Sequence, residues 1–136
     1  MKAITFLVSL ALCAGAAIAQ TATFTNFGRP CGGDLNGSQV RGPAVQMDVT
    51  NAAPGSYAIL CVGQQQRPVA LPGSNCYLVV NPRITLNTQV DRAGNASFLL
   101  RLPNMPINVD MQVVTVALSR NGRTAESTNG VNLVWR

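Results

Sequence analysis

Histidine is absent from the whole 136-residue sequence, and its absence removes much of the side-chain chemistry open to a small protein. Ser-His-Asp and Cys-His catalysis need an imidazole base, and many zinc and copper sites need imidazole ligands. Lys2 is the only lysine, and it lies in a segment that we expect to be removed. Schiff-base and Ser-Lys chemistry are then excluded from the mature chain. The sequence also lacks a P-loop and a strand-linked G-x-G-x-x-G motif.

Five carboxylates remain as candidates for acid–base chemistry: Asp34, Asp48, Asp91, Asp110 and Glu126. Glycoside hydrolysis needs two acids that face each other across a cleft, whereas each acid here is isolated in the sequence. Asp91 and Asp110 lie at expected strand ends, where short acids commonly cap turns. Asp91 and Asn95 also form a candidate calcium site, but a hairpin turn accounts for the same residues. We therefore expect no catalytic residue, no metal and no cofactor, and predict that the protein is not an enzyme.

Aromatic side chains could instead form a sugar-stacking platform. Trp135 lies one residue from the C-terminus, where we expect it to be exposed. The polar run Gln64–Gln66 and the adjacent Arg67 lie in an expected loop. Trp135, Gln65 and Arg67 are therefore candidate ligand contacts.

The mature charge is mildly basic, with nine arginines against four aspartates and one glutamate. These arginines are scattered, without a basic run or an interleaved aromatic motif. We interpret them as a solvated surface and expect no nucleic-acid partner.

The N-terminus has the three parts of a secretory signal peptide. Lys2 provides the positive charge, residues 3–16 are largely apolar, and residues 17–19 form an A-x-A cleavage site. We therefore expect a signal peptide over 1–19 and a single mature domain over 20–136. The apolar run is short for a membrane anchor, so no membrane span is expected in the mature chain. The expected location is secreted, cell-surface or periplasmic.

Three cysteines remain after cleavage: Cys31, Cys61 and Cys76. Export favours one disulfide and leaves one thiol over. Closing the loop from Cys31 to Cys76 would restrict the unfolded chain by about 4 kcal/mol, and the loop from Cys61 to Cys76 by about 3 kcal/mol. The spacing alone therefore leaves the pairing open.

Short alternating or apolar runs separated by turn residues predict an all-β antiparallel β-sandwich of about eight strands. Residues 28–42 and 63–75 are expected to be loops, Asn81-Pro82 to end a strand, and Asn121-Gly122 to form a hairpin turn. The run 57–62 suits a central strand. Strands are expected at 21–26, 44–50, 57–62, 76–80, 84–90, 96–102, 111–118 and 131–135.

The order of several short motifs resembles an uncharacterised domain common in bacterial exported proteins. The motifs are a Gly/Cys loop at 28–33, an N-A-x-P-G-S turn at 51–56, an apolar strand at 58–63, C-x-L-V-V at 76–80, D-x-x-G-x-A at 91–96, L-P-N at 102–104 and S-x-N-x-x-x-L at 127–133. The resemblance implies a β-sandwich and a Cys31–Cys76 disulfide, and it implies no catalytic residue. The sequence departs from the pattern at Asn75, where glycine is usual.

These observations favour an exported, non-catalytic β-sandwich that acts as an extracellular binding or structural module. One alternative is a subunit of an extracellular filament or surface layer, in which the strand that begins at Thr21 is exchanged between chains. Another alternative is a carbohydrate-binding module. The partner is then either a second copy of the chain or an extracellular glycan or protein.

Overall fold

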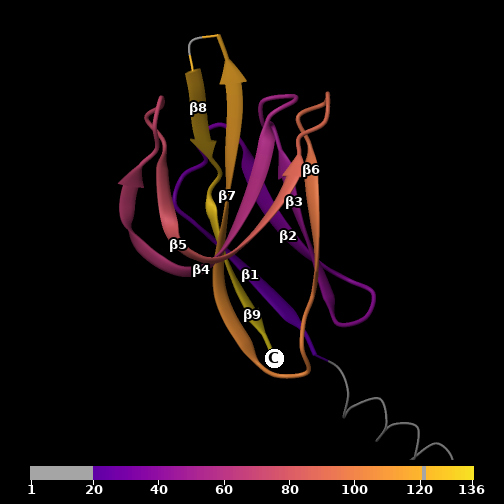
Figure 1. The fold of residues 1–136 in the computed structure, drawn as a ribbon. Helices are drawn as coiled ribbons and strands as arrows, with labels where there is room; N and C mark the ends of the chain where they lie inside the picture. The colour runs from indigo at the N-terminus through magenta and orange to yellow at the C-terminus, as the bar shows by residue number, and fades with distance from the viewer. Residues whose placement is uncertain (1–19, 121) are drawn as a thin grey trace, which may run out of the picture.

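The computed structural model describes residues 20–120 and 122–136, so the expected signal peptide lies outside the described residues. The described residues form nine β-strands in one six-stranded and one three-stranded antiparallel sheet (Figure 1). This confirms the predicted antiparallel β-sandwich, with one strand more than expected. In chain order the strands are β1 (Ala22–Phe27), β2 (Asp34–Val40), β3 (Ala44–Thr50), β4 (Tyr57–Ala70), β5 (Tyr77–Gln89), β6 (Ala96–Arg101), β7 (Ile107–Ser119), β8 (Gly122–Ser127) and β9 (Gly130–Trp135).

The larger sheet has the strand order β1-β9-β7-β4-β5, and β8 also pairs with β7. β9 pairs with β7 from Ile107 to Met111, and β8 pairs with it from Val114 to Ser119, so these two short strands share one edge of β7. The pairing of Ser119 with Gly122 shows a hairpin between β7 and β8 near the expected position. Gly122 is the first residue of β8 and does not form the turn that was expected at Asn121-Gly122, and β8 itself was not predicted. Asn121 itself lies outside the described residues. The smaller sheet has the order β2-β3-β6.

The main core lies between the two sheets, because alternate residues of each strand point to the same face. Burying one such Val, Leu or Met side chain stabilises the fold by about 1.5–3 kcal/mol. The core is therefore the main source of stability that holds the sheets together. Its fully buried members include Leu35, Val45, Met47 and Val49 from the smaller sheet, and Leu60, Met111, Val113 and Val131 from the larger sheet.

The predicted loop over 28–42 was wrong, because β2 occupies most of it. β2 pairs with β3 along its whole length, from Asp34 opposite Thr50 to Val40 opposite Ala44. Its glycine and polar residues disguise it in the sequence. Burial of Leu35 and a complete ladder outweigh the weak strand propensity of these residues.

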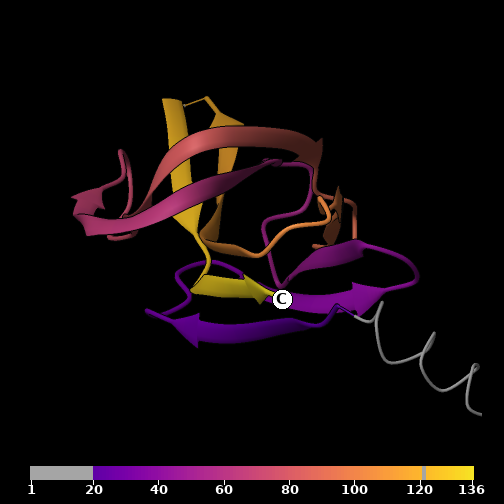
Figure 2. The ribbon, with the colours of Figure 1, turned by 90° about the horizontal axis from the view of Figure 1, so that it is seen from below.

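The predicted loop over 63–75 was also wrong, because β4 continues to Ala70. β4 and β5 form a long hairpin with register shifts between Val62 and Gly63 and between Gln65 and Val69. Such bulges bend a strand. The distal half of the hairpin curls over the outer face of the larger sheet (Figures 1 and 2). A second apolar cluster forms there, with Cys61, Val80, Val114 and Ala125 at its centre.

The expected strand end at Asn81-Pro82 was wrong as well, because β5 runs through it. Pro82 lies opposite Gly63, beside the first register shift. β5 is also an edge strand, and a proline is tolerated at a bulge or an edge because no ladder hydrogen bond is lost. The prediction of a central strand over 57–62 was correct, since β4 lies between β5 and β7.

Candidate functional site

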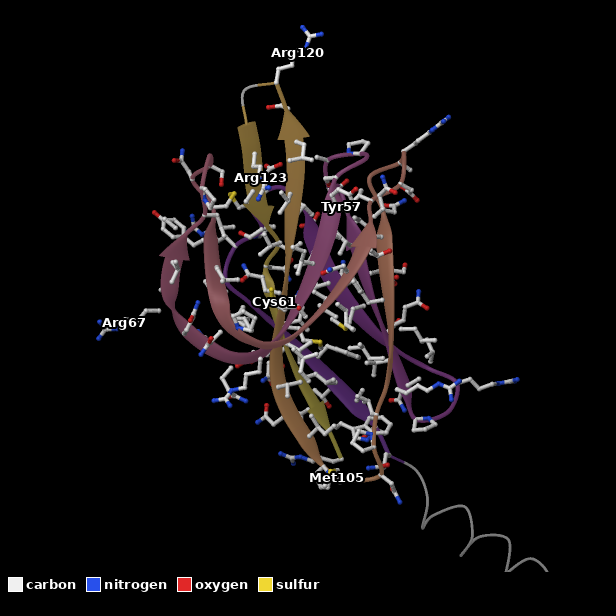
Figure 3. The ribbon with its side chains drawn as sticks, in the orientation of Figure 1. Tyr57, Cys61, Arg67, Met105, Arg120 and Arg123 are labelled. Atoms are coloured by element: carbon white, nitrogen blue, oxygen red, sulfur yellow. A yellow bond between two sulfur atoms is a disulfide. The ribbon has the colours of Figure 1, made fainter. Side chains whose placement is uncertain are left out.

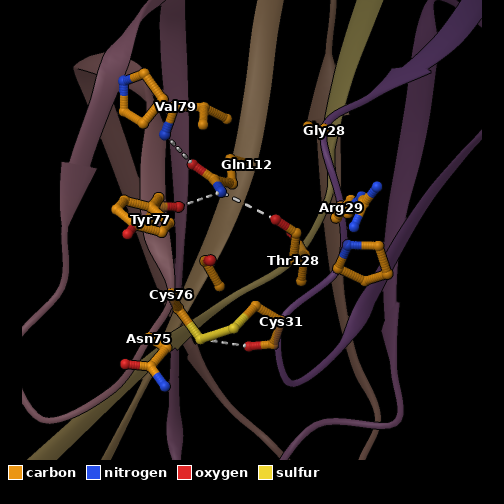
Figure 4. Close-up of a pocket in the computed structure, with 13 residues that line it drawn as sticks. Gly28, Arg29, Cys31, Asn75, Cys76, Tyr77, Val79, Gln112 and Thr128 are labelled. Carbon is orange, nitrogen blue, oxygen red and sulfur yellow. Dashed lines mark hydrogen bonds between the residues drawn. A yellow bond between two sulfur atoms is a disulfide. The ribbon is translucent and has the colours of Figure 1, made fainter.

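A hollow of about 370 Å³ lies on the outer face of the larger sheet, beside the Cys31–Cys76 disulfide (Figure 4). We call it the disulfide pocket. Three parts of the chain enclose it: the β1–β2 loop, the tip of the β4–β5 hairpin, and the neighbouring segments of β7, β8 and β9. Its lining residues are Gly28, Arg29, Pro30, Cys31, Pro68, Asn75, Cys76, Tyr77, Val79, Gln112, Ser127, Thr128 and Gly130.

The disulfide fixes the two loops that form opposite sides of the pocket. It joins Cys31 of the β1–β2 loop to Cys76 at the hairpin tip, with 5.6 Å between the two Cα atoms. This confirms the pairing implied by the family resemblance. Backbone hydrogen bonds also run both ways between Cys31 and Ser127, at 2.8 and 3.1 Å. The β1–β2 loop is therefore held both covalently and by the end of β8.

Gln112 supports the pocket from below. Its side chain accepts a hydrogen bond from the Val79 amide at 2.9 Å, and it donates to the carbonyls of Tyr77 at 3.0 Å and Thr128 at 2.9 Å. Gln112 is almost completely buried. One amide thereby links β7 to the hairpin tip and to the β8–β9 turn, and it satisfies backbone groups that would otherwise be unpaired.

The rim of the pocket combines apolar surface with one positive charge. Pro30, Pro68 and the half-exposed ring of Tyr77 supply flat apolar surface. Arg29 is the only charged residue among the lining residues. Figure 4 places Tyr77 and Arg29 on opposite sides of the hollow. A cation on one side of the hollow and an aromatic ring on the other suit a ligand with an apolar body and an anionic group.

Ser127 supplies a hydroxyl to the pocket. The residue is only 2% exposed, and its hydroxyl takes part in none of the side-chain hydrogen bonds found among the described residues. Ser127 is one of the residues that line the pocket.

The three residues proposed from the sequence as ligand contacts do not come together. Trp135 is 1% exposed and its ring N–H donates to the Pro103 carbonyl at 3.1 Å, so the expectation that it is exposed was wrong. Gln65 and Arg67 are exposed on β4, and Arg67 points away from the molecule in Figure 3. None of the three lines the disulfide pocket.

The four aspartates have structural partners. Asp91 accepts hydrogen bonds from the amides of Ala93 and Asn95, both at 2.9 Å, which confirms a turn here. The prediction of a hairpin was wrong, because β5 and β6 belong to different sheets. Asp110 accepts from the Gln65 amide at 2.9 Å, a donor that the β4 bulge leaves free. Asp48 accepts from the side chain of Ser97 at 2.7 Å. Within residues 20–120 and 122–136, no three Asp, Glu, Cys or His side chains gather in a metal-binding group.

Sequence reasoning missed Arg29, Tyr77 and Gln112. Arg29 and Tyr77 are close neighbours of Cys31 and Cys76 in the sequence. A disulfide between those cysteines brings Arg29 and Tyr77 close together. The cysteine pairing could therefore have indicated this site. Gln112 gave no such signal, because it lies inside an apolar run that predicts only a buried strand.

Comparison with known proteins assigns no family to the chain: no family model, curated protein or solved structure matches it. In the part of the chain that the structure describes, no helix has the length and apolar character needed to cross a bilayer.

Proposed function

We propose that the protein is an exported, non-catalytic binding module whose site is the disulfide pocket. The observation that carries this proposal is the construction of that pocket: a covalently fixed, apolar-walled hollow with one cation at its rim. Pre-formed concave sites with few polar groups are typical of small-ligand binding. The signal-peptide pattern, the disulfide and the resemblance to exported bacterial domains support an extracellular or periplasmic location.

The ligand class follows from the lining. Arg29 has no acidic neighbour among the lining residues, so no carboxylate of the lining opposes a ligand carboxylate. Tyr77 and the two prolines suit an aromatic or branched apolar group, and the Ser127 hydroxyl offers one hydrogen bond. We therefore infer that the pocket takes an apolar group that carries an acidic substituent, such as an aromatic carboxylate or an apolar C-terminal residue of a peptide.

The test is a titration of isotope-labelled mature protein with 3-phenylpropionate and with its neutral amide, followed by NMR. Both compounds should shift the amide signals of Val79, Cys76 and Thr128. Arg29 should favour the carboxylate by about two- to fivefold, the range expected of a solvent-exposed ion pair. Arg29→Gln should abolish that preference, and Tyr77→Ala should weaken both compounds.

Arg67→Gln is the matched control, because Arg67 is equally exposed but lies outside the pocket. It should leave the preference unchanged. The proposal fails if neither compound shifts the three signals, or if the Arg67 and Arg29 variants behave alike. A turnover activity that disappears on mutation of a single carboxylate would contradict the non-catalytic part of the proposal.

Carbohydrate binding is a second candidate, and its support is the half-exposed ring of Tyr77 on the pocket rim. Trp135 cannot contribute a stacking surface in this fold, because it is buried. A glycan array separates the two candidates. Binding of neutral sugars that is lost in Tyr77→Ala but kept in Arg29→Gln would favour the carbohydrate module.

The filament alternative needs an exchanged N-terminal strand. In this structure β1 pairs with β9 of its own chain over six residues, from Ala22 opposite Trp135 to Phe27 opposite Gly130. Exchange would first have to break this ladder. We therefore rank that alternative below the binding module.

A further inference from the structure

The edge strands on the two sides of the sandwich differ in how their backbone groups are hydrogen-bonded. On the side where β1 and β2 are the edge strands, amide side chains take the place of a missing strand. Gln39 accepts from the Ala22 amide and donates to the Gln20 carbonyl, both at 2.9 Å. Asn129 accepts from the Leu35 amide at 2.9 Å and donates to the Leu35 carbonyl at 3.1 Å. These side chains therefore already pair four backbone groups on this side.

On the opposite side, formed by β5 and β6, the Gln112 amide bridges Tyr77 and Val79 at the start of β5, but residues 81–87 have no such bridge among the described residues. β5 is the last strand of the larger sheet, and β4 is the only strand with which it pairs. Figure 2 shows it along the margin of the molecule, without a strand beyond it. Residues 81–87 are all exposed, with Ile84 60% and Leu86 38% accessible. Such an edge can accept another extended chain.

The two exposed apolar side chains of β5 lie next to the main core. Ile84 pairs with Val62, and Leu86 pairs with the fully buried Leu60. Directly paired residues share a face of a sheet. Ile84 and Leu86 therefore lie on the inner face, where the smaller sheet does not extend far enough to cover them. A further strand at this edge would complete the same apolar layer.

The hydrogen-bond alternation of β5 identifies which backbone groups are free. The Val90 amide donates to the Ser56 carbonyl on the β4 side at 2.8 Å. The register is continuous from Gln89 to Ile84, and antiparallel residues alternate in the direction of their N–H and C=O groups. Thr88, Leu86 and Ile84 therefore point towards β4, whereas Thr85 and Asn87 present free donors and acceptors to solvent.

We propose that β5 pairs antiparallel with β5 of a second copy of this chain, about a two-fold axis at Thr85. In that register Thr85 exchanges two backbone hydrogen bonds with its symmetry mate, and Ile84 lies beside Leu86 of the other copy. The apolar pair is therefore self-complementary, as a two-fold interface requires. The two larger sheets join into one continuous sheet with both inner faces on the same side.

Charge does not oppose a second copy as the occupant. Arg83 is the only charged residue of β5, and the register places it opposite Asn87. The two Arg83 side chains lie at opposite ends of the paired segment, about 13 Å apart at the usual rise per residue, which is beyond the screening length at physiological salt. Pro82 lies beyond the first register shift and has no N–H to donate to a further strand. Pairing is thereby limited to one short register.

The first test is the mass of the mature protein in solution, by light scattering across a concentration series. We expect a concentration-dependent monomer–dimer equilibrium without larger species. Thr85→Pro should shift it to monomer while the domain stays folded, because the Thr85 amide faces away from β4. Ile84→Lys should have the same effect. Leu99→Lys is the control, since Leu99 is 62% exposed on the outward-facing side of β6.

The second test fixes the register. Cα atoms opposite each other in a hydrogen-bonded pair are about 5.5 Å apart, which a disulfide can bridge. Thr85→Cys should therefore form an intermolecular disulfide on mild oxidation, and Leu99→Cys should not. A strict monomer at millimolar concentration, a ladder of higher oligomers, or a dimer that survives both Thr85→Pro and Ile84→Lys would overturn the proposal. None of these variants touches the disulfide pocket, so its ligand binding is tested separately.

Discussion

The thiol of Cys61 is buried on the outer face of the larger sheet, in the second apolar cluster. Its side chain is 4% exposed, and burial raises the pKa of the thiol above its ordinary value of 9.0. Thiolates react and thiols do not. Cys61 is therefore a packing residue, although it is the one free thiol among the described residues.

We predict that Cys61 is inert in the folded protein. An aromatic disulfide reagent at pH 8 should titrate no thiol in buffer and one thiol per chain in denaturant. Because the folded pKa is raised, its contribution to stability is fully present below pH 9 and is lost as the pH rises through the folded pKa. The free energy of unfolding should fall more steeply above pH 9 than in Cys61→Ala, measured by rapid denaturant jumps.

At Gly37, the ring of Phe24 fills the space that a side chain would take. A Cβ atom added there would lie 2.3 Å from two ring carbons of Phe24 and 3.0 Å from the Met47 sulfur. Phe24 packs against the main core from β1. The ring therefore uses the glycine as its contact surface, which explains a glycine in the middle of β2.

We predict that Gly37→Ala destabilises the domain by about 1–3 kcal/mol, because Phe24 must leave its position to make room. The comparison is Gly33→Ala, where the added Cβ meets its nearest neighbours at an ordinary 3.5 Å. Urea unfolding followed by Trp135 fluorescence measures both. Equal midpoints for the two variants would contradict this account of Gly37.

At the scale of strands, the curled tip of the β4–β5 hairpin depends on Gln112. We predict that Gln112→Leu costs about 2–4 kcal/mol, because it leaves one backbone donor and two backbone acceptors without their partner, and the Thr128 carbonyl among them is buried. Hydrogen exchange should accelerate at Val79 in particular. Gln64→Leu is the control, since Gln64 is exposed on β4 and should change stability by less than about 0.5 kcal/mol. Similar losses in both variants would count against this role.

Strands whose side chains alternate cleanly could be predicted from the sequence. β3 is the clearest case, because Val45, Met47 and Val49 recur at every second position and all are fully buried. β2 could not be predicted, because a glycine in mid-strand is explained only by the ring of Phe24 that lies against it in the folded protein. The distal part of β4 was hidden for a different reason: its exposed glutamines form a strand through pairing with β5 across two bulges.

The candidate site was predictable only in part. The cysteine pairing followed from the family resemblance, and it locates the pocket. The placement of Trp135 was wrong because its position near the C-terminus suggested exposure, whereas β9 is a fully paired inner strand. Proximity to a chain end does not decide burial when the last strand lies between two others.

At the scale of the whole molecule, the disulfide connects segments that are 45 residues apart in the chain. We predict that the Cys31→Ser, Cys76→Ser double variant loses about 4 kcal/mol of unfolding free energy, the loop-entropy value for a closure of that length. Urea denaturation with and without reductant gives the same comparison in the native sequence. The main core should survive, because neither cysteine belongs to it. An unchanged midpoint would mean that the unfolded chain is already compact in this region.

The backbone hydrogen bonds between Thr21 and Arg136 have a mechanical consequence. These residues bond to each other in both directions, at 2.9 and 3.1 Å. A pulling force applied between these two residues would break the hydrogen bonds between β1 and β9 one pair after another, starting at Ala22 and Trp135. Because the bonds break singly, the force required would be low. Separation of β1 would run past Phe27 and stop at Cys31, where the disulfide ties the β1–β2 loop to the β4–β5 hairpin. The domain would thus lengthen by one short strand before the force on its N-terminal side reaches a covalent bond.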